Sequence, residues 1–357
     1  MRANPRIAAI TILCELDKTR LPVSVFFEKI ERSTDLEPKD RQLTRKIVYG
    51  VLRNRDYLDY LLELLCRQPL NKTKPFVRQA LRSGLFQIFF LDRIPPSAAV
   101  NETVKAVKSK RFPTQVQGFV NGVLRESIRR KTDLPGPGES DAAGRPLLNH
   151  PPWLTDRWQK QYGRDEMIRI CRHNNLEPLL CLRTDSGEDQ ARLRQKLTSQ
   201  GIEAVNGSYA PNCLILPTYR GKTNDIIGID QGIVQVQGKA SQLASLLLAP
   251  FPPGLSCLDG CAGVGGKTTH LASLLNSETS KLTAVEPDLR RYRLLVQNLQ
   301  NRQHHCRVIT CNQSLQEFAG TGPAAFDRLL IDAPCSGTGV IGKHPEIRWN
   351  RREDELL

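Results

Sequence analysis

From residue 255 onward the sequence repeats one pattern, in which a short apolar strand is followed by a turn and a helix. Strands are expected at LSCLDG (255–260), KLTAVEP (281–287), CRVITCN (306–312) and FDRLLIDAP (326–334). Helices are expected at KTTHLASLLN (267–276) and DLRRYRLLVQNLQN (288–301). This alternation requires crossover connections, which make neighbouring strands parallel and cover the sheet with helices. The sequence therefore predicts a doubly wound α/β domain over residues 251–357.

The part of the chain before this domain divides into three segments. Residues 1–131 have apolar residues at helical spacing. One such run is RQLTRKIVYGVLRNRDYLDYLLELLC (41–66), with Leu43, Ile47, Val51, Leu58, Leu61, Leu62 and Leu65. Residues 132–152 are rich in proline, glycine and small polar residues, which is typical of a linker. Residues 153–250 combine short apolar runs, PLLCLRT and CLILP, with one helical run. We expect a multidomain protein with an all-α domain, a linker, a small α+β module and the α/β domain.

The positive charge is concentrated in the helical region. Residues 1–150 carry 27 Lys and Arg against 16 Asp and Glu (+11), and residues 151–357 carry 24 against 21 (+3), for a total of +14. A basic block favours a polyanionic partner, because phosphates that are neutralised by the protein release counterions. A soluble surface with excess lysine and arginine is the simpler alternative.

Other features exclude several classes of protein. There is no apolar run of 18 residues and no cleavage pattern near the N-terminus, so we expect neither a membrane span nor a signal peptide. The ten cysteines lack the paired CxxC spacing of zinc sites, which predicts no metal. Free thiols of this kind fit the reducing cytoplasm.

A glycine-rich turn, LDGCAGVGGKTTH (258–270), follows the first strand of the α/β domain. Its glycines allow a tight turn that brings a ligand close to a helix N-terminus. The spacing does not match the GxGxxG of dinucleotide sites, and Cys261 stands where a P-loop needs its first glycine. S-adenosylmethionine is the third ligand class, with Glu286 at the next strand end to hold its ribose. The same carboxylate also suits a dinucleotide or a solvated strand end.

The segment DAPCSGTG (332–339) carries a second chemical motif. A thiolate that adds to carbon 6 of cytosine makes carbon 5 nucleophilic, and carbon 5 then accepts a methyl group from a sulfonium. Cys335 offers such a thiol, and Asp332 is placed to hydrogen-bond the N3 edge of the ring. A base in a duplex would first have to leave its stack. The simpler alternative for Cys335 is a thiol that packs at a strand end.

These residues resemble those of a known family. LDGCAGVGGKTTH resembles the D-x-C-A-A-P-G-G-K-T signature of RNA cytosine-5 methyltransferases, and IDAPCSGTGVIGKHPEIRW resembles their fourth motif. RQLTRKIVYGVL and VNGVLR resemble the antitermination factor NusB. The chain is thus identified as similar to the bacterial 16S rRNA (cytosine-C5)-methyltransferase B (RsmB/Sun) family. The resemblance implies a NusB-like RNA-binding domain, a small RNA-binding module and a Rossmann-like methyltransferase domain.

The resemblance also implies the ligands and the site residues. The cofactor would be S-adenosylmethionine and the partner 16S rRNA, with no DNA and a monomeric protein. The implied cofactor-binding residues are Cys261, Ala262, Gly263, Val264, Gly265, Gly266, Lys267, Glu286, Asn312 and Asp332. Asn312 stands where the family has Asp, and AGVGG replaces AAPGG.

The two catalytic candidates are Asp332 and Cys335. In the family the attacking thiol lies in a later Thr-Cys motif, beyond Leu357, and the cysteine at the position of Cys335 helps to release the product. The resemblance therefore implies a chain shortened at its C-terminus, with an incomplete sheet that leaves an apolar edge strand. From chemistry alone, Cys335 can also be the nucleophile. A second interpretation of the whole chain is an RNA-binding protein without catalysis, which uses its NusB-like domain.

Overall fold

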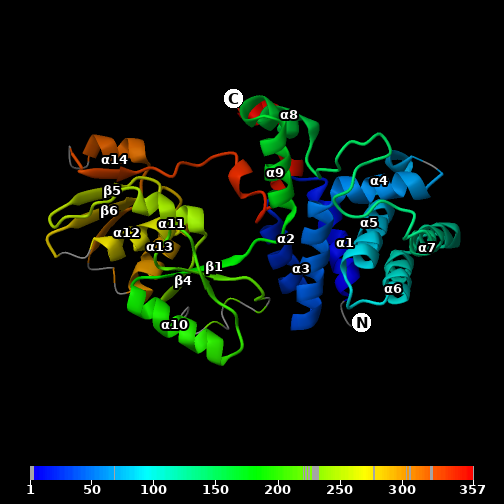
Figure 1. The fold of residues 1–357 in the computed structure, drawn as a ribbon, viewed down its shortest axis with the longest axis horizontal. Coiled ribbons are helices and arrows are strands. Elements are labelled where there is room, and N and C mark those ends of the chain that lie inside the picture. The colour runs from blue at the N-terminus through cyan, green and yellow to red at the C-terminus, as the bar shows by residue number, and fades with distance from the viewer. Residues whose placement is uncertain are drawn as a thin grey trace. The chain divides into compact units, whose positions relative to one another are not determined.

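The computed structural model describes residues 4–356 except 68, 220, 222, 224, 225, 227–232, 276, 277, 303, 305, 306 and 322–324. The chain forms two compact units, and its order of elements can be followed in Figure 1. One unit comprises Met1–Pro178 together with Ser336–Leu357, and the other comprises Leu179–Cys335. Cys306, the first residue of the expected third strand, lies outside the described residues.

Helices make up the first part of the larger unit. They are α1 (Pro5–Leu16), α2 (Val23–Ser33), α3 (Pro38–Arg53), α4 (Arg55–Leu65), α5 (Pro75–Phe90), α6 (Pro96–Ser109) and α7 (Thr114–Arg129), with a 3₁₀ turn, η1 (Leu70–Lys72). Proline in the first turn starts α1, α3, α5 and α6, where its missing N–H has no intrahelical partner to lose. The helical expectation is confirmed, and Asn54 divides the run after Leu43 into α3 and α4.

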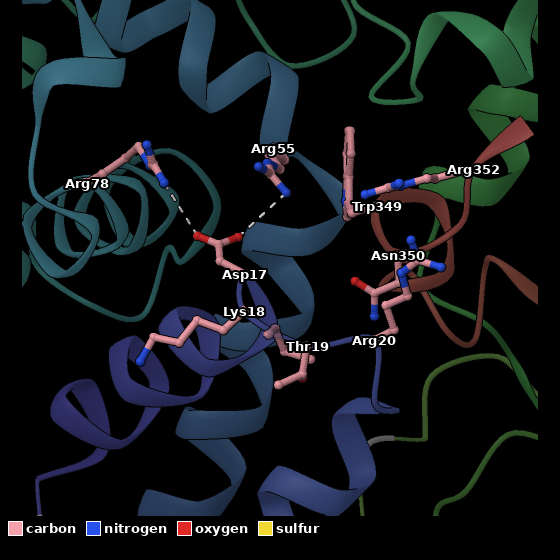
Figure 2. A pocket seen from close by; sticks show the side chains of 10 residues that line it. Asp17, Lys18, Thr19, Arg20, Arg55, Arg78, Trp349, Asn350 and Arg352 are labelled. Carbon is pink, nitrogen blue, oxygen red and sulfur yellow. Dashed lines mark ion pairs between the residues drawn. The ribbon is translucent and has the colours of Figure 1, made fainter.

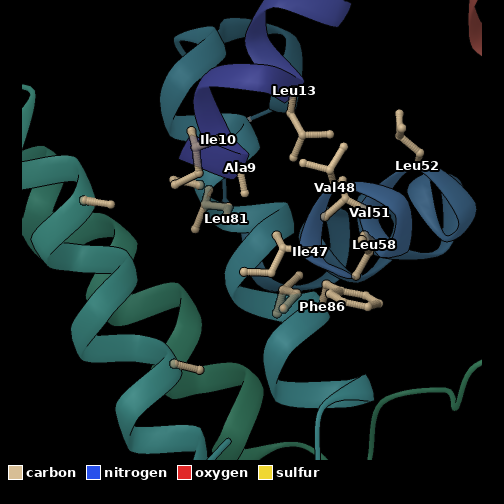
Figure 3. Close-up of a cluster of buried hydrophobic side chains, with 14 of the residues drawn as sticks. Ala9, Ile10, Leu13, Ile47, Val48, Val51, Leu52, Leu58, Leu81 and Phe86 are labelled. Atoms are coloured by element: carbon tan, nitrogen blue, oxygen red, sulfur yellow. The ribbon is translucent and has the colours of Figure 1, made fainter. Parts of the chain in front are cut away.

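The core of this helical region is built around α5. Figure 3 shows its Leu81 and Phe86 among apolar side chains of α1, α3 and α4. Gly50 of α3 is what allows the close approach, because a Cβ placed there would lie 1.9 Å from Cζ of Phe86. Phe86 is 5% exposed, so its ring has little space into which to move.

The same unit continues with two helices and the C-terminal segment. The helices are α8 (Pro152–Tyr162) and α9 (Arg164–Asn175), and the segment contains η3 (Thr338–Val340), α15 (Ile347–Asn350) and η4 (Glu353–Leu356). Arg348 of α15 is 1% exposed and donates to the carbonyls of Asn149 (2.7 Å) and Asn174 (3.1 Å). Trp349 donates from Nε1 to the carbonyl of Leu52 at 2.8 Å. These bonds attach the segment after Cys335 to the helical unit.

The smaller unit begins with an antiparallel four-stranded sheet. Its elements are β1 (Leu180–Thr184), α10 (Gly187–Ser199), β2 (Val205–Asn206), β3 (Cys213–Leu216), β4 (Val234–Val236) and α11 (Lys239–Leu246). The strands pair antiparallel in the order β2-β3-β1-β4. This sheet is the expected small α+β module.

The second sheet of this unit is parallel throughout its described strands. Its elements are β5 (Ser256–Asp259), α12 (Gly266–Leu274), β6 (Lys281–Val285), α13 (Leu289–Asn301), β7 (Val308–Cys311), α14 (Leu315–Thr321) and β8 (Arg328–Leu330). The order is β7-β6-β5-β8, so the chain runs outward through β6 and β7 and returns to the other side of β5. Such a reversal opens a ligand crevice at the carboxyl ends of the strands. The strand β8 forms one edge. Leu329 in this strand and Ile331 just after it are about half exposed.

Among the described residues, no helix has the length and apolar character needed to span a bilayer.

The packing of α3 on α5 gives a matched pair of glycine substitutions. We expect Gly50→Ala to lower the free energy of unfolding by about 1–3 kcal/mol, because the new methyl group overpacks the core at Phe86. Gly118→Ala, at an exposed site on α7 with open space around the new Cβ, should raise it by about 0.5–1 kcal/mol. Urea denaturation measures both, and equal effects of the two substitutions would contradict this packing.

Candidate cofactor and catalytic site

The residues predicted to bind the cofactor lie at the carboxyl ends of four neighbouring parallel strands. The glycine-rich turn follows β5, and Glu286 follows β6. Asn312 follows β7, and Asp332 lies just beyond β8. Parallel pairing places these four strand ends at one edge of the sheet. The fold thus brings together segments from positions 259 to 332.

Backbone hydrogen bonds fix the turn between β5 and α12. The N–H of Ala262 donates to the carbonyl of Val285 at 2.9 Å, and the N–H of Gly265 donates to the carbonyl of Ala262 at 2.9 Å. Gly263 (φ 59°) and Gly265 (φ 89°) have left-handed backbone, which glycine adopts without steric cost. Gly265 is also sterically required, because a Cβ there would lie 2.7 Å from Cδ1 of Leu295.

Two features of this turn suit a ligand. A Cβ added at Gly263 would meet no described atom within 4 Å, so open space faces this residue. Helix α12 begins at Gly266 without a side-chain cap among the described residues. The first N–H groups of a helix have no intrahelical acceptor, and a polar or anionic ligand can supply one. Val264 is exposed at the tip of the turn, and Cys261 is half-buried at its start.

Glu286 is tied to this turn although it belongs to the next strand. Its side chain is buried, and Oε2 accepts from the N–H of Gly263 at 2.9 Å while Oε1 accepts from the N–H of Asp288 at 2.9 Å. Each carboxylate oxygen keeps a second acceptor site, which fits the two hydroxyls of a ribose. Asn312 donates from Nδ2 to the carbonyls of Glu286 (2.8 Å) and Pro287 (3.1 Å), so its amide oxygen stays available as an acceptor.

Lys267 and Asp332 form an ion pair across the crevice. Lys267 lies in the first turn of α12, and its Nζ donates to Oδ2 of Asp332. The Asp332 side chain is still 58% exposed, so its other oxygen can reach a substrate. Cys335 is exposed as well, whereas a thiol that packs at a strand end would be buried. The pKa of Cys261 is raised, by burial first and then by nearby carboxylates, which disfavours its thiolate.

Asp259 is a functional candidate that the sequence analysis did not single out. It ends β5, is 1% exposed, and accepts from Oγ1 of Thr268 at 2.7 Å. Burial raises its pKa to about 6, and the hydrogen bonds from Thr268 and from the backbone of Cys261 offset only part of that rise. A carboxylate at the end of an apolar strand, directly before a glycine-rich turn, is the signal that could have identified it.

Arg183 in the antiparallel sheet was also missed. It is fully buried on β1, and Nη2 donates to Oγ1 of Thr269 in α12 (3.0 Å) and to Oε1 of Gln235 (2.6 Å). Gln237 adds a bond from Nε2 to the carbonyl of Gly266 at 3.1 Å. The sheet therefore holds the first turn of α12, the helix that starts at the glycine-rich turn. The feature of the sequence that could have identified Arg183 is that it is a single arginine inside the apolar strand LCLRT.

Groups of three or more His, Cys, Asp or Glu side chains that could hold a metal ion are absent from the described part of the chain.

Comparison with family profiles gives three matches along the chain. Residues 3–129 match the NusB family, and residues 150–220 match the ferredoxin-like domain of RsmF/B-like methyltransferases. Residues 245–357 match the 16S rRNA methyltransferase RsmB/F profile. The expected all-α, α+β and α/β parts of the fold are thereby confirmed.

Curated relatives decide the family. The chain is 31% identical over 366 residues to "Probable ribosomal RNA small subunit methyltransferase B" of Bacillus subtilis, with 99% of this chain and 78% of that protein covered. It is 34% identical over 322 residues to "Ribosomal RNA small subunit methyltransferase B" of Vibrio cholerae, with 90% and 72% covered. The chain belongs to the ribosomal RNA small subunit methyltransferase B family. The family resemblance expected from the motifs is confirmed.

Solved structures agree with this family at the level of the fold. The crystal structure of PH0851 covers all of this chain and 80% of its own, with a TM-score of 0.72 at 23% identity. NSun6 from Pyrococcus horikoshii, solved with SFG, covers 58% of this chain and 75% of its own, with a TM-score of 0.50 at 15% identity.

Asp259 makes the stability of this family member depend on pH in a defined direction. Its pKa is about 6 in the folded protein and 3.8 for the unperturbed group, so the folded state binds the proton more tightly. The contribution of Asp259 to the free energy of unfolding is therefore fully present below pH 4. It falls by about 2–3 kcal/mol as the pH rises through 6. We expect Asp259→Asn to remove this loss, as measured by urea denaturation of both proteins between pH 4 and pH 7.

A control of opposite sign lies at the start of α13. The N-cap residue Asp288 has a lowered pKa because it accepts from the backbone N–H of Arg291 and of Arg290. Its contribution is present at neutral pH and is lost as the pH falls, so Asp288→Asn should act in the reverse direction. A stability difference between wild type and Asp259→Asn that does not change with pH would rule out the protonated buried carboxyl.

Proposed function

We propose that the protein transfers a methyl group from S-adenosylmethionine to carbon 5 of a cytosine in 16S rRNA. The carrying observation is the convergence, at one edge of a parallel sheet, of a left-handed glycine turn, a buried carboxylate and the Lys267–Asp332 pair. The family supports the reaction class, and the relatives named above supply the small-subunit rRNA as the substrate.

The residues at this edge fit the proposed cofactor. The open space at Gly263 and the uncapped start of α12 would hold its amino-acid part. The free acceptor sites of Glu286 would bind the ribose hydroxyls, and the amide oxygen of Asn312 would accept from the adenine amine. When bound, S-adenosylmethionine supplies a methyl group on a positively charged sulfur, which makes it an electrophile.

The chemistry at the cytosine ring needs a thiol and groups that hold or accept a proton. A cysteine thiolate adds to carbon 6, and the electron pair of the 5,6 double bond moves to carbon 5. Carbon 5 takes the methyl group and then loses its proton to a base, and the thiolate leaves carbon 6 as the double bond returns. Asp332 holds the N3 edge as charge develops there, and Lys267 orients Asp332. We assign Cys335 to the elimination step, as the family resemblance implies.

The decisive test is the product. We expect the full-length protein to transfer labelled methyl from S-adenosylmethionine to 16S rRNA, with 5-methylcytidine as the labelled nucleoside after digestion. Asp332→Asn should lose at least 100-fold in rate, which is the lower end for removal of an acid–base group. Label on another base or position would overturn the proposal. A protein that binds 16S rRNA but neither binds the cofactor nor transfers methyl would support the non-catalytic RNA-binding interpretation.

The cofactor site has a test of its own. We expect Glu286→Gln to weaken S-adenosylmethionine binding by about tenfold or more in calorimetry, because a hydrogen bond to a charged group contributes roughly 1.5–3 kcal/mol. Glu317→Gln is the matched control, since the Glu317 carboxylate also accepts from a backbone N–H, that of Ser314 at 2.8 Å, but is exposed on α14. Equal affinities of the two variants for S-adenosylmethionine would mean that Glu286 does not bind the cofactor.

A further inference from the structure

A basic pocket lies in the larger unit and is lined by residues that have no role in the proposed reaction. It has a volume of about 390 Å³, and the usual ligand pocket has about 300–1,000 Å³. The lining comes from the end of α1 and the loop after it, the first turns of α4 and α5, and the segment around α15. The lining includes Asp17, Arg55, Arg78, Trp349 and Arg352 (Figure 2).

The charge in this pocket is strongly unbalanced. Five lining side chains are cationic and one, Asp17, is anionic. Glu15 pairs with Lys18, and Glu355 pairs with Arg20. Among the lining residues this leaves Arg55, Arg78 and Arg352 with the single carboxylate of Asp17. Asp56 and Asp59, which do not line the pocket, also act on the charge of Arg55. Guanidinium groups that converge in this way provide paired N–H donors for a phosphate.

The carboxylate of Asp17 is already shared. Figure 2 shows it between Arg55 and Arg78, with N···O distances of 3.8 Å and 3.6 Å. Both distances are longer than a direct hydrogen bond. Oδ2 of Asp17 accepts instead from Nε2 of Gln79 at 2.7 Å. The two arginines therefore keep N–H donors that Asp17 does not use.

Two further observations fit an anionic ligand in this pocket. Nε of Arg78 is buried and has no hydrogen-bond partner in the described structure, and a buried donor without an acceptor is uncommon in folded proteins. The pKa of Arg55 is lowered, first by burial and then by the positive charge of Arg82, and the carboxylates of Asp17, Asp59 and Asp56 offset only part of this lowering. An anion in the pocket would stabilise the charges of both guanidinium groups.

One wall of the pocket is aromatic. The guanidinium carbon of Arg55 lies 5.0 Å from the centre of the Trp349 ring, and Nε1 of Trp349 donates to the carbonyl of Leu52. The tryptophan is thus held in place both by its N–H and by a cation–π contact. Arginines beside a fixed aromatic ring are typical of sites that bind a nucleic-acid backbone next to an unstacked base.

We propose that this pocket binds a phosphate group of the substrate RNA. The inference deepens the proposed function and rests on it, because it takes rRNA as the substrate. A phosphodiester matches the guanidinium donors, and a pocket of this volume accommodates the phosphate with part of its nucleotide. Trp349, Asn350 and Arg352 follow Cys335 in the chain. RNA held here would therefore contact the segment that continues from the loop with Cys335.

The test measures RNA binding as a function of salt concentration. The probe is a fluorescent single-stranded fragment of 16S rRNA with the full-length protein, and the variants are Arg78→Gln, Arg78→Lys and Arg32→Gln. Arg78→Gln leaves Asp17 paired with Arg55 and Gln79, so the fold should persist, and circular dichroism checks this. Arg32 is the control for lost charge, because its side chain is 83% exposed on α2 and does not line the pocket.

We expect Arg78→Gln to weaken RNA binding several-fold and to reduce the slope of log K against log salt by about 0.7, the value for one single-strand phosphate contact. Arg78→Lys should restore most of the slope, and Arg32→Gln should leave it unchanged. Equal slopes for Arg78→Gln and Arg32→Gln would overturn the proposal.

A second arm distinguishes RNA from free phosphate. Inorganic phosphate should raise the Tm of wild type more than that of Arg78→Gln, and the RNA fragment should abolish this difference by competition. A phosphate effect that depends on Arg78 but does not respond to RNA would mean a site for free phosphate and would overturn the RNA assignment. If the wild type binds no 16S rRNA, the proposed substrate fails, while the phosphate measurement still reports on the pocket itself.

Discussion

Parallel pairing of four short strands is the constraint on which the rest of the methyltransferase domain depends. Because β7, β6, β5 and β8 run in one direction, their carboxyl ends meet although they are separated by more than 70 residues of chain (332 − 259 = 73). The bond between Gly263 and Glu286 then joins two adjacent strand ends into one surface. An antiparallel pairing of the same sequences would place alternate ends at opposite edges. The candidate chemistry is thus a consequence of strand direction.

Strong periodic patterns made much of the fold predictable. The helices of the first domain and the strand–turn–helix units were visible because apolar spacing and proline or glycine boundaries agree with each other. The division at Asn54 was not visible, since the apolar spacing continues through it from α3 into α4. The anchoring of residues 336–357 to the helical unit was also missed, because it rests on bonds from Arg348 and Trp349 to backbone carbonyls. Backbone acceptors leave no trace in a sequence.

The site was predictable where it depends on local backbone and less so where it depends on tertiary contacts. The glycines at 263 and 265 predicted a tight turn, and in the structure both have left-handed backbone. Asp259 and Arg183 were overlooked, because a buried charge is recognised by its partners, and these come from other elements. The basic pocket was hidden for the same reason, since its arginines come from helices and loops that are distant in sequence. Net charge indicated a polyanion, but tertiary structure was needed to suggest a place for it.

The position of Arg348 has a consequence for how genetic data on such proteins are interpreted. The arginine belongs to the HPEIRW continuation of the fourth motif, yet its cation is buried among carbonyl oxygens of the helical unit rather than beside a reacting atom. A screen for inactive mutants would recover Arg348 together with Asp332 and would group the two as catalytic. Their defects differ in kind, because loss of Arg348 detaches a segment from its support while the reacting groups stay chemically intact.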